Sequence, residues 1–332
     1  MKILFKLSHS LQQRQQEKAR WIFPVELSMY ATYLRNQGQG VVWDGKDDGG
    51  FDKIISSEDQ IDVPFLDLPA ADRNLTRGMD KKWQNNGNFK YNPGTYTLAA
   101  SGCWYGKCGF CAEKNKKYEV RKVGLVLHEM AGCYEQGFKE IFDDSGTFPD
   151  GDWLREFCNR KIIAGIDIPI SCNMRIGADV DFELMKRVGF RMVLFGIESG
   201  SQKVLDRINK GTKVEDIIPT IKAAAKAGLE PHIAGMVGMP FETEEDSIKT
   251  IKLFKYLMLH GYAKTSQMSL YKSEYCSPNE SARKYLNKHM SVIFNPLFWW
   301  NKIKDIKSSA DLSYFIKQIN EGVRIFKERK VQ

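Results

Sequence analysis

From about residue 95 to residue 271, short apolar runs typical of β-strands alternate with runs of helical periodicity, and glycine repeatedly separates them. Strands that alternate with helices indicate parallel βαβ units. Six units are too few for a closed eight-stranded barrel, so we expect an α/β fold with a partial (β/α)6 TIM-like barrel; a doubly wound sheet is the alternative. The expected strands cover residues 95–100, 138–144, 168–173, 190–196, 230–238 and 265–271, and the first three expected helices cover 124–137, 152–165 and 181–189.

Two further helices are expected from apolar spacing. Thr212 and Glu215 have the spacing of a capping box in front of one apolar run, and Gly228 would end that helix. Pro219 lies inside the run, so we expect the helix to kink there or to begin later than the box indicates. The second of these helices carries an apolar stripe over residues 248–258.

The sequence on either side of this region follows other patterns. A strand at the start of the chain, a helix over 24–38 and strands over 40–45 and 51–56 indicate a small α/β unit. The last 60 or so residues show no strand–helix rhythm and are expected to be mostly helical. The expected organisation is an N-terminal unit at 1–75, a linker at 76–94, the partial barrel at 95–271 and a C-terminal extension at 272–332, which we expect to face the substrate.

Composition excludes several classes of protein. With 332 residues, of which 42% are hydrophobic, the chain can bury a large core. No apolar run approaches the eighteen residues of a membrane span, and the start lacks the features of a signal peptide, so we expect a cytoplasmic protein. The net charge of +8 is modest, and the lysines near the C-terminus favour a solvated surface over a nucleic-acid interface.

Three of the seven cysteines lie in the segment SGCWYGKCGFC, with C-x4-C-x2-C spacing. In a reducing compartment, clustered cysteines are more often metal ligands than disulfides, and several thiolates together select zinc or an iron–sulfur cluster. A structural zinc ion takes four ligands, for which His128 is a candidate here. Three thiolates on a [4Fe–4S] cluster would leave one iron open to another ligand. The predicted metal ligands are Cys103, Cys108 and Cys111.

The other four cysteines show no metal-ligand spacing. Cys133, Cys158 and Cys172 lie in apolar helix or strand positions and are expected to be small buried side chains. Cys276 belongs to no motif.

The order of these features resembles the radical S-adenosylmethionine (radical SAM) superfamily, and the resemblance extends from about residue 95 to 270. It implies a [4Fe–4S] cluster on the three cysteines and an S-adenosylmethionine site built from five strand-end loops. By the resemblance, Phe110 seats the adenine, and the acidic segment from Asp143 to Ser145 receives the methionine amino group. Arg175 faces the methionine carboxylate, and Glu198 and Ser199 contact the ribose or methionine. The loop from Gly238 to Pro240 borders the adenine. The implied cofactor-binding residues are Phe110, Asp143, Asp144, Ser145, Arg175, Glu198, Ser199, Gly238 and Pro240.

One feature departs from the commonest pattern of that superfamily. Its usual spacing is C-x3-C-x2-C, whereas this chain has one more residue between Cys103 and Cys108. The extra residue puts direct transfer of the loop geometry in question.

The resemblance also implies an activity. A radical SAM enzyme takes one electron from an external donor of the flavodoxin or ferredoxin type, cleaves S-adenosylmethionine and uses the 5′-deoxyadenosyl radical to abstract hydrogen from a substrate, which is unknown here. A radical SAM methyltransferase or methylthiotransferase is the alternative. A non-catalytic iron–sulfur or zinc protein, acting as a sensor or nucleic-acid binder, is the alternative from another class.

The N-terminal unit resembles the start of the cobalamin-binding domain that precedes many radical SAM barrels. It is shorter than that domain and lacks the Asp-x-His-x-x-Gly motif, which His9 does not match. The resemblance therefore implies a truncated domain that binds no cobalamin.

Overall fold

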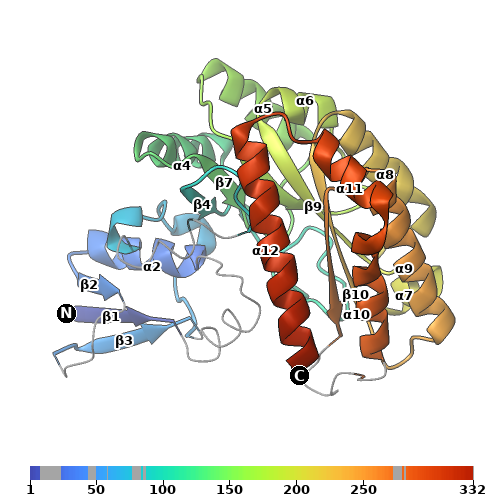
Figure 1. Ribbon diagram of the computed structural model, residues 1–332. Coiled ribbons are helices and arrows are strands. Elements are labelled where there is room, and N and C mark those ends of the chain that lie inside the picture. The colour runs from blue at the N-terminus through green and yellow to red at the C-terminus, as the bar shows by residue number, and fades with distance from the viewer. Residues whose placement is uncertain are drawn as a thin grey trace.

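Six parallel strands form the main sheet of the computed structural model, which describes residues 1–7, 24–43, 50–57, 59–76, 84, 87–271, 279 and 282–331. The strand order is β11-β10-β9-β8-β7-β4, so strands that follow one another in this region of the chain are neighbours in space. They are β4 (Gly94–Thr97), β7 (Glu140–Asp143), β8 (Ile170–Met174), β9 (Phe190–Glu198), β10 (Glu230–Val237) and β11 (Thr265–Leu270). The curled sheet confirms the predicted partial barrel (Figure 1).

Helices on the outer face of the sheet cover it with apolar side chains. The outward residues of the strands, such as Ile141, Ile170 and Val193, pack into one buried cluster with those helices. The helices are α4 (Val123–Glu135), α5 (Gly151–Ile163), α6 (Phe182–Arg187), α7 (Gln202–Arg207), α8 (Val214–Lys226) and α9 (Glu244–Leu259). A short antiparallel pair, β5 (Ala100–Ser101) and β6 (Glu119–Val120), brackets the cysteine segment.

The predicted capping box at the start of α8 was wrong. Lys213 is the N-cap, without a side-chain cap, and α8 continues through Pro219. The capping box occurs at α9 instead, where the Thr243 side chain accepts from the Asp246 backbone and the Asp246 side chain accepts from the Thr243 backbone. Apolar spacing therefore located both helices correctly, while the first cap was assigned to the wrong helix.

The N-terminal unit is a second, three-stranded parallel sheet of order β2-β1-β3 with one helix. Its elements are β1 (Lys2–Lys6), α2 (Val25–Asn36), β2 (Gly40–Trp43) and β3 (Lys53–Ser56), followed by the 3-10 turns η1 (Phe65–Asp67) and η2 (Arg73–Thr76). The apolar cluster of this unit continues into the half-barrel through Phe89, Tyr96 and Phe142. Arg73 also reaches the half-barrel, pairing with the buried Glu129 of α4 at 2.6 Å. The two sheets therefore share this second apolar cluster.

The chain after β11 is helical, as predicted, with α10 (Arg283–Met290), the 3-10 turn η4 (Ser291–Phe294), α11 (Pro296–Lys304) and α12 (Ser309–Val331). Phe298 is buried in the main core and Trp299 packs against it, whereas Trp300 is exposed. Two of these three aromatic residues therefore serve packing. Whether the segment faces the substrate stays a prediction, as do the proposed boundaries of the four regions.

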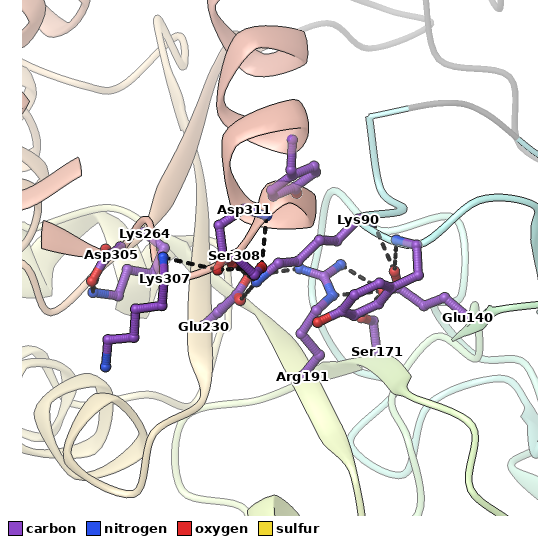
Figure 2. Close-up of polar contacts among 12 residues, drawn as sticks. Lys90, Glu140, Ser171, Arg191, Glu230, Lys264, Asp305, Lys307, Ser308 and Asp311 are labelled. Atoms are coloured by element: carbon purple, nitrogen blue, oxygen red, sulfur yellow. Dashed lines mark hydrogen bonds and ion pairs between the residues drawn. The ribbon is translucent and has the colours of Figure 1, made fainter. Parts of the chain in front are cut away.

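Charged side chains fill the amino ends of the barrel strands (Figure 2). Arg191 of β9 contacts Glu140 of β7 at 2.6 Å and Glu230 of β10 at 2.7 Å. Lys90 pairs with Glu230 at 3.0 Å and also with Asp311 in the first turn of α12. The Arg191 guanidinium lies 5.3 Å from the centre of the Tyr314 ring, also on α12. These ion pairs join the strands to one another and to the last helix.

The remaining sequence-based predictions divide into three groups. Cys133, Cys158 and Cys172 are buried, as expected. His9, Cys276 and residues 77–83 and 85–86 of the predicted linker lie outside the described residues. Over the described residues, no helix has the length and apolar character needed to cross a bilayer.

Candidate functional site

A cavity of about 200 Å³ lies beside the cysteine segment at the carboxyl ends of the barrel strands. Asn173 and Met174 from β8, Gly196 and Glu198 from β9 and Ala234 from β10 contribute to its wall. The three cysteines, together with Phe110, Glu113, Arg175 and Lys210, complete most of the rest. The cavity thus has the position in which parallel α/β proteins place their chemistry.

The cysteine segment is held by backbone contacts that leave little room for larger residues. Gly102 has a φ of +75° and a Cβ there would lie 2.5 Å from the Lys117 carbonyl oxygen. The Gly109 amide donates to the Ile208 carbonyl at 2.8 Å, and the Glu113 amide donates to Cys111 Sγ at 3.4 Å. Cys108 is buried, and Cys103 and Cys111 are half-buried. The fold therefore presents three sulfur atoms to one cavity.

The three thiols influence one another electrostatically. Burial raises the pKa of the Cys111 thiol, and the nearby charges of Cys108 and Cys103 raise it further against the Glu113 amide hydrogen bond. A cationic metal group would reverse this balance by stabilising thiolates.

The donor set fits an iron–sulfur cluster better than a single metal ion. Within the described residues, no three Cys, His, Asp or Glu side chains converge closely enough to hold one ion. His128 is exposed on α4 and does not line the cavity. A tetrahedral zinc site needs four ligands on one centre, whereas each thiolate of a cubane binds its own iron. Three separate thiolates that line one cavity therefore fit a cubane cluster better than a zinc ion.

Arg175 joins the cavity to the cysteine segment. Its Nη1 lies 3.6 Å from Cys108 Sγ and its Nη2 donates to the Lys210 carbonyl oxygen. Its guanidinium stacks on the Tyr105 ring at 4.1 Å and lies 5.3 Å from the Trp104 ring. The Arg175 Nε is buried and has no hydrogen-bond partner. The predicted methionine-carboxylate residue therefore contacts a predicted cluster ligand.

Glu198 and Lys210 form an ion pair on the cavity wall, with 2.9 Å between Oε1 and Nζ. Glu198 adopts a φ of +66°, a strained backbone conformation for a residue with a side chain. Lys210 Nζ also lies 5.8 Å from the centre of the Phe110 ring. A Cβ on Gly196 would lie 2.6 Å from Glu198 Oε1, so the glycine makes room for the pair. Lys210 was not predicted from the sequence.

The acidic segment at the end of β7, Asp143 to Ser145, mostly makes hydrogen bonds to the neighbouring strand ends. Asp143 is fully buried and accepts from the Ala99 amide at 2.8 Å and from Thr97 Oγ1 at 2.9 Å. The Ser145 hydroxyl donates to Asp143 at 2.5 Å. Asp144 accepts from Asn173 Nδ2 at 3.4 Å, and burial raises its pKa to about 7. None of these three predicted residues lines the cavity.

The remaining predicted residues also lie outside the cavity wall. Ser199 Oγ is 3.0 Å from Thr250 Oγ1 of α9, and both groups are buried. The Gly238 amide donates to Glu242 Oε2 at 2.6 Å, and Pro240 is exposed. The structure thus brings Phe110, Arg175 and Glu198 together with the cysteines and leaves the other assignments as predictions.

Comparison with known proteins agrees with this geometry. Residues 98–254 match the family model described as the radical SAM superfamily. An uncharacterised methyltransferase of Pyrococcus horikoshii is 29% identical over 212 residues, which cover 61% of this chain and 43% of that protein. A candidate methylthiotransferase of Methanocaldococcus jannaschii is 38% identical over 171 residues, covering 47% of this chain and 37% of that protein.

Among solved structures, the chain is similar to the cobalamin-dependent S-adenosylmethionine radical enzyme OxsB with aqua-cobalamin and S-adenosylmethionine bound. The TM-score is 0.50 at 14% identity, and the match covers 70% of this chain and 34% of that one. This similarity supports the fold alone. The chain spans less than half the length of each of these three relatives. The family match, the half-barrel and the cysteine spacing agree with one another, and residues 98–254 form a radical SAM domain.

Proposed function

We propose that this protein binds a [4Fe–4S] cluster on Cys103, Cys108 and Cys111 and reductively cleaves S-adenosylmethionine in the adjoining cavity. The observation that carries the proposal is that three thiols and a buried Glu198–Lys210 ion pair line the same cavity. When bound, the cluster supplies the single electron that breaks a carbon–sulfur bond of the sulfonium. The side chains of the protein would then bind and orient S-adenosylmethionine and exclude water from it.

The ion pair suits the amino-acid portion of S-adenosylmethionine, which carries one ammonium and one carboxylate. The Lys210 ammonium can pair with the carboxylate, while Glu198 accepts from the ammonium or from a ribose hydroxyl. Because Glu198 and Lys210 already neutralise each other, a zwitterion can replace each partner without leaving a buried charge unpaired. The site is therefore preorganised for a ligand that carries both charges.

Apolar groups complete the proposed site. Phe110, Met174, Leu194 and Ala234 line the same cavity. An aromatic ring offers a face for adenine, and the aliphatic residues exclude water from the reacting atoms. Positioning and exclusion of water are what a radical reaction requires of the protein.

Methyl transfer is a second candidate reaction, because two of the relatives are described as a methyltransferase and a candidate methylthiotransferase. One of the solved structures binds cobalamin, so the absence of cobalamin here stays a prediction. Radical SAM enzymes generally need an external electron donor, and a donor of the flavodoxin or ferredoxin type stays a prediction as well.

Anaerobic reconstitution with iron and sulfide, followed by S-adenosylmethionine and dithionite, tests the proposal. We expect 5′-deoxyadenosine and methionine in equal amounts from the native protein. The Cys108→Ala variant should lose this product and most of its iron, because a thiolate ligand is gone. Cys133→Ala is the matched control: that thiol is buried in α4 away from the cavity, and its loss should leave both readouts unchanged.

The products separate the alternatives. S-adenosylhomocysteine in place of 5′-deoxyadenosine would indicate methyl transfer from the sulfonium to an acceptor. Native protein that holds a full complement of iron yet forms neither product would indicate a non-catalytic iron–sulfur protein. A Cys108→Ala variant that retains its full iron content would show that this cysteine is not a cluster ligand, and would overturn the proposed site.

A further inference from the structure

The stretch between the first two cysteines, which is one residue longer than usual, makes specific contacts in this structure. It contributes Trp104 and Tyr105, whose rings pack edge to face with centroids 6.2 Å apart. Both rings lie against the guanidinium of Arg175, which directly follows β8, and Tyr105 is the closer at 4.1 Å. Cation–π contacts of this length hold a guanidinium in one place. The longer loop thus builds an aromatic support for a single cation.

That cation lies next to a sulfur atom. Arg175 Nη1 is 3.6 Å from Cys108 Sγ, and Nη2 is tied to the Lys210 carbonyl oxygen. Arg175 is 6% exposed, so water screens its charge poorly. A buried guanidinium with a hydrogen bond to a thiolate favours additional negative charge on that thiolate and on any metal group it binds.

A second set of contacts fixes Tyr105 itself. Its hydroxyl donates to Asn209 Oδ1 at 2.9 Å, and Asn209 Nδ2 donates to the Lys107 carbonyl at 3.2 Å. Gly211 has a φ of +66°, and a Cβ there would lie 2.5 Å from the Tyr105 hydroxyl. The cysteine loop and the loop over 208–211 are therefore closed on each other, and Arg175 is held between them.

We infer that Arg175, held by Tyr105, sets the reduction potential of the cluster by stabilising its reduced form through Cys108. The inference rests on the proposed function, because it requires a cluster on the three cysteines. Reduction adds one negative charge to the cluster, and the fixed cation with its N–H···S bond lowers the free energy of that state. Arg175 acts through Cys108 and is a positioning residue. The longer loop supplies the support that this role requires.

Anaerobic redox titration of the reconstituted protein, followed by electron paramagnetic resonance without S-adenosylmethionine, tests the inference. Arg175→Met keeps the length of the side chain but removes its charge and its hydrogen bonds. We expect the ratio of reduced to oxidised cluster at a fixed potential to fall at least about tenfold, which is about 59 mV for one electron. Arg175→Lys keeps the charge without the planar stack and should fall between Arg175→Met and the native protein.

Two further variants test the support. Tyr105→Leu removes the ring and should shift the potential in the same direction by less, because Arg175 stays in the chain. Tyr105→Phe keeps the ring and should titrate close to the native protein. An Arg175→Met protein with full iron content and an unchanged potential would overturn the inference, and would leave Arg175 with a role in ligand binding alone.

Each remaining outcome also decides a claim. If Arg175→Met does not assemble a cluster, the Tyr105→Leu variant decides, and an unchanged potential there overturns the inference. If the native protein assembles no cluster, the proposed function fails first, and the inference fails with it. A native cluster that forms normally but responds to none of these substitutions refutes the inference while leaving the proposed function in place.

Discussion

At the amino ends of the barrel strands, Arg191 lies between Glu140 and Glu230 and is ion-paired with both. At the carboxyl ends, Arg175 leaves its Nε without a partner and faces a cavity. Both arginines are almost fully buried, at 4% and 6% exposure. The same residue type therefore serves two different environments within one sheet.

The difference fits an amino end that supports the fold and a carboxyl end that forms the proposed binding site. The Glu140 carboxylate accepts from Arg191 and from the Ser171 hydroxyl, as well as from the Lys90 and Tyr91 amides. A buried carboxylate with that many donors costs little to bury and a great deal to leave unpaired. At the other end, the buried Arg175 Nε has no hydrogen-bond partner and the Glu198 backbone is strained, which is what the proposed ligand site would require.

Removing Arg191 should produce the largest loss of stability in this comparison. Arg191→Met leaves Glu140 buried without its cation and deprives Glu230 of one of its two cations, and we expect the free energy of unfolding to fall by about 3–5 kcal/mol. Urea unfolding followed by circular dichroism measures the change. Arg155→Met is the matched control: this arginine is exposed and pairs with Asp152 and Asp179 at the surface, so the loss should be much smaller. Equal losses in the two variants would show that the amino-end ion pairs do not hold the sheet.

Removing Lys210 should weaken ligand binding strongly and the stability of the fold only slightly. Lys210→Met removes the ammonium that we propose pairs with the carboxylate of S-adenosylmethionine, so we expect S-adenosylmethionine to bind about 10- to 100-fold more weakly. The free energy of unfolding should fall by only about 1 kcal/mol, because water in the cavity can solvate the Glu198 carboxylate. Anaerobic calorimetry on the reconstituted protein gives the affinity.

Lys203→Met serves as the control for this affinity. Lys203 is an exposed lysine of α7 that pairs with Asp246 at 3.5 Å and does not line the cavity. A Lys210→Met variant that unfolds as readily as Arg191→Met while binding S-adenosylmethionine normally would break the distinction between the two ends.

Most of the fold followed from local pattern, because glycine punctuation and apolar periodicity depend on neighbouring residues alone. The strand predicted over 190–196 and the one observed, Phe190–Glu198, differ only at the carboxyl end. The prediction of a capping box at Thr212 was wrong because it, too, relied on neighbouring residues alone. Thr212 and Thr243 both have an acidic residue three positions later, and only tertiary packing selects which threonine is the N-cap.

The candidate site was less predictable, since it depends on which loops meet. The spacing of the cysteines was enough to predict them as metal ligands. Lys210, by contrast, lies twelve residues after Glu198, and the chain between them forms α7 before it returns to the cavity. A lysine that follows Glu198 and Ser199 after one short helix is the signal that could have identified it. The contact between Arg175 and Cys108 spans 67 residues, and no local pattern encodes it.

The smallest expected effect concerns the pH dependence of stability at the carboxyl end. Burial raises the pKa of Asp144 to about 7, and the charges of Asp143 and Glu113 add to the shift against the Asn173 hydrogen bond. The folded state therefore holds this proton more tightly than the unfolded chain, in which the pKa is about 3.9. The resulting stabilisation is fully present below about pH 4 and is lost as the pH rises through about 7.

Asp144→Asn should flatten the fall in unfolding free energy between pH 4 and 7, measured as urea midpoints on the cluster-free protein. Asp152→Asn, which changes an exposed carboxylate, should leave the slope unchanged. Because Asp143, with a pKa raised to about 6, still titrates in this range, some slope should persist in Asp144→Asn. A slope identical to that of the native protein would show that Asp144 is ionised in the folded state, and that the carboxyl end, like the amino end, stabilises its buried charges.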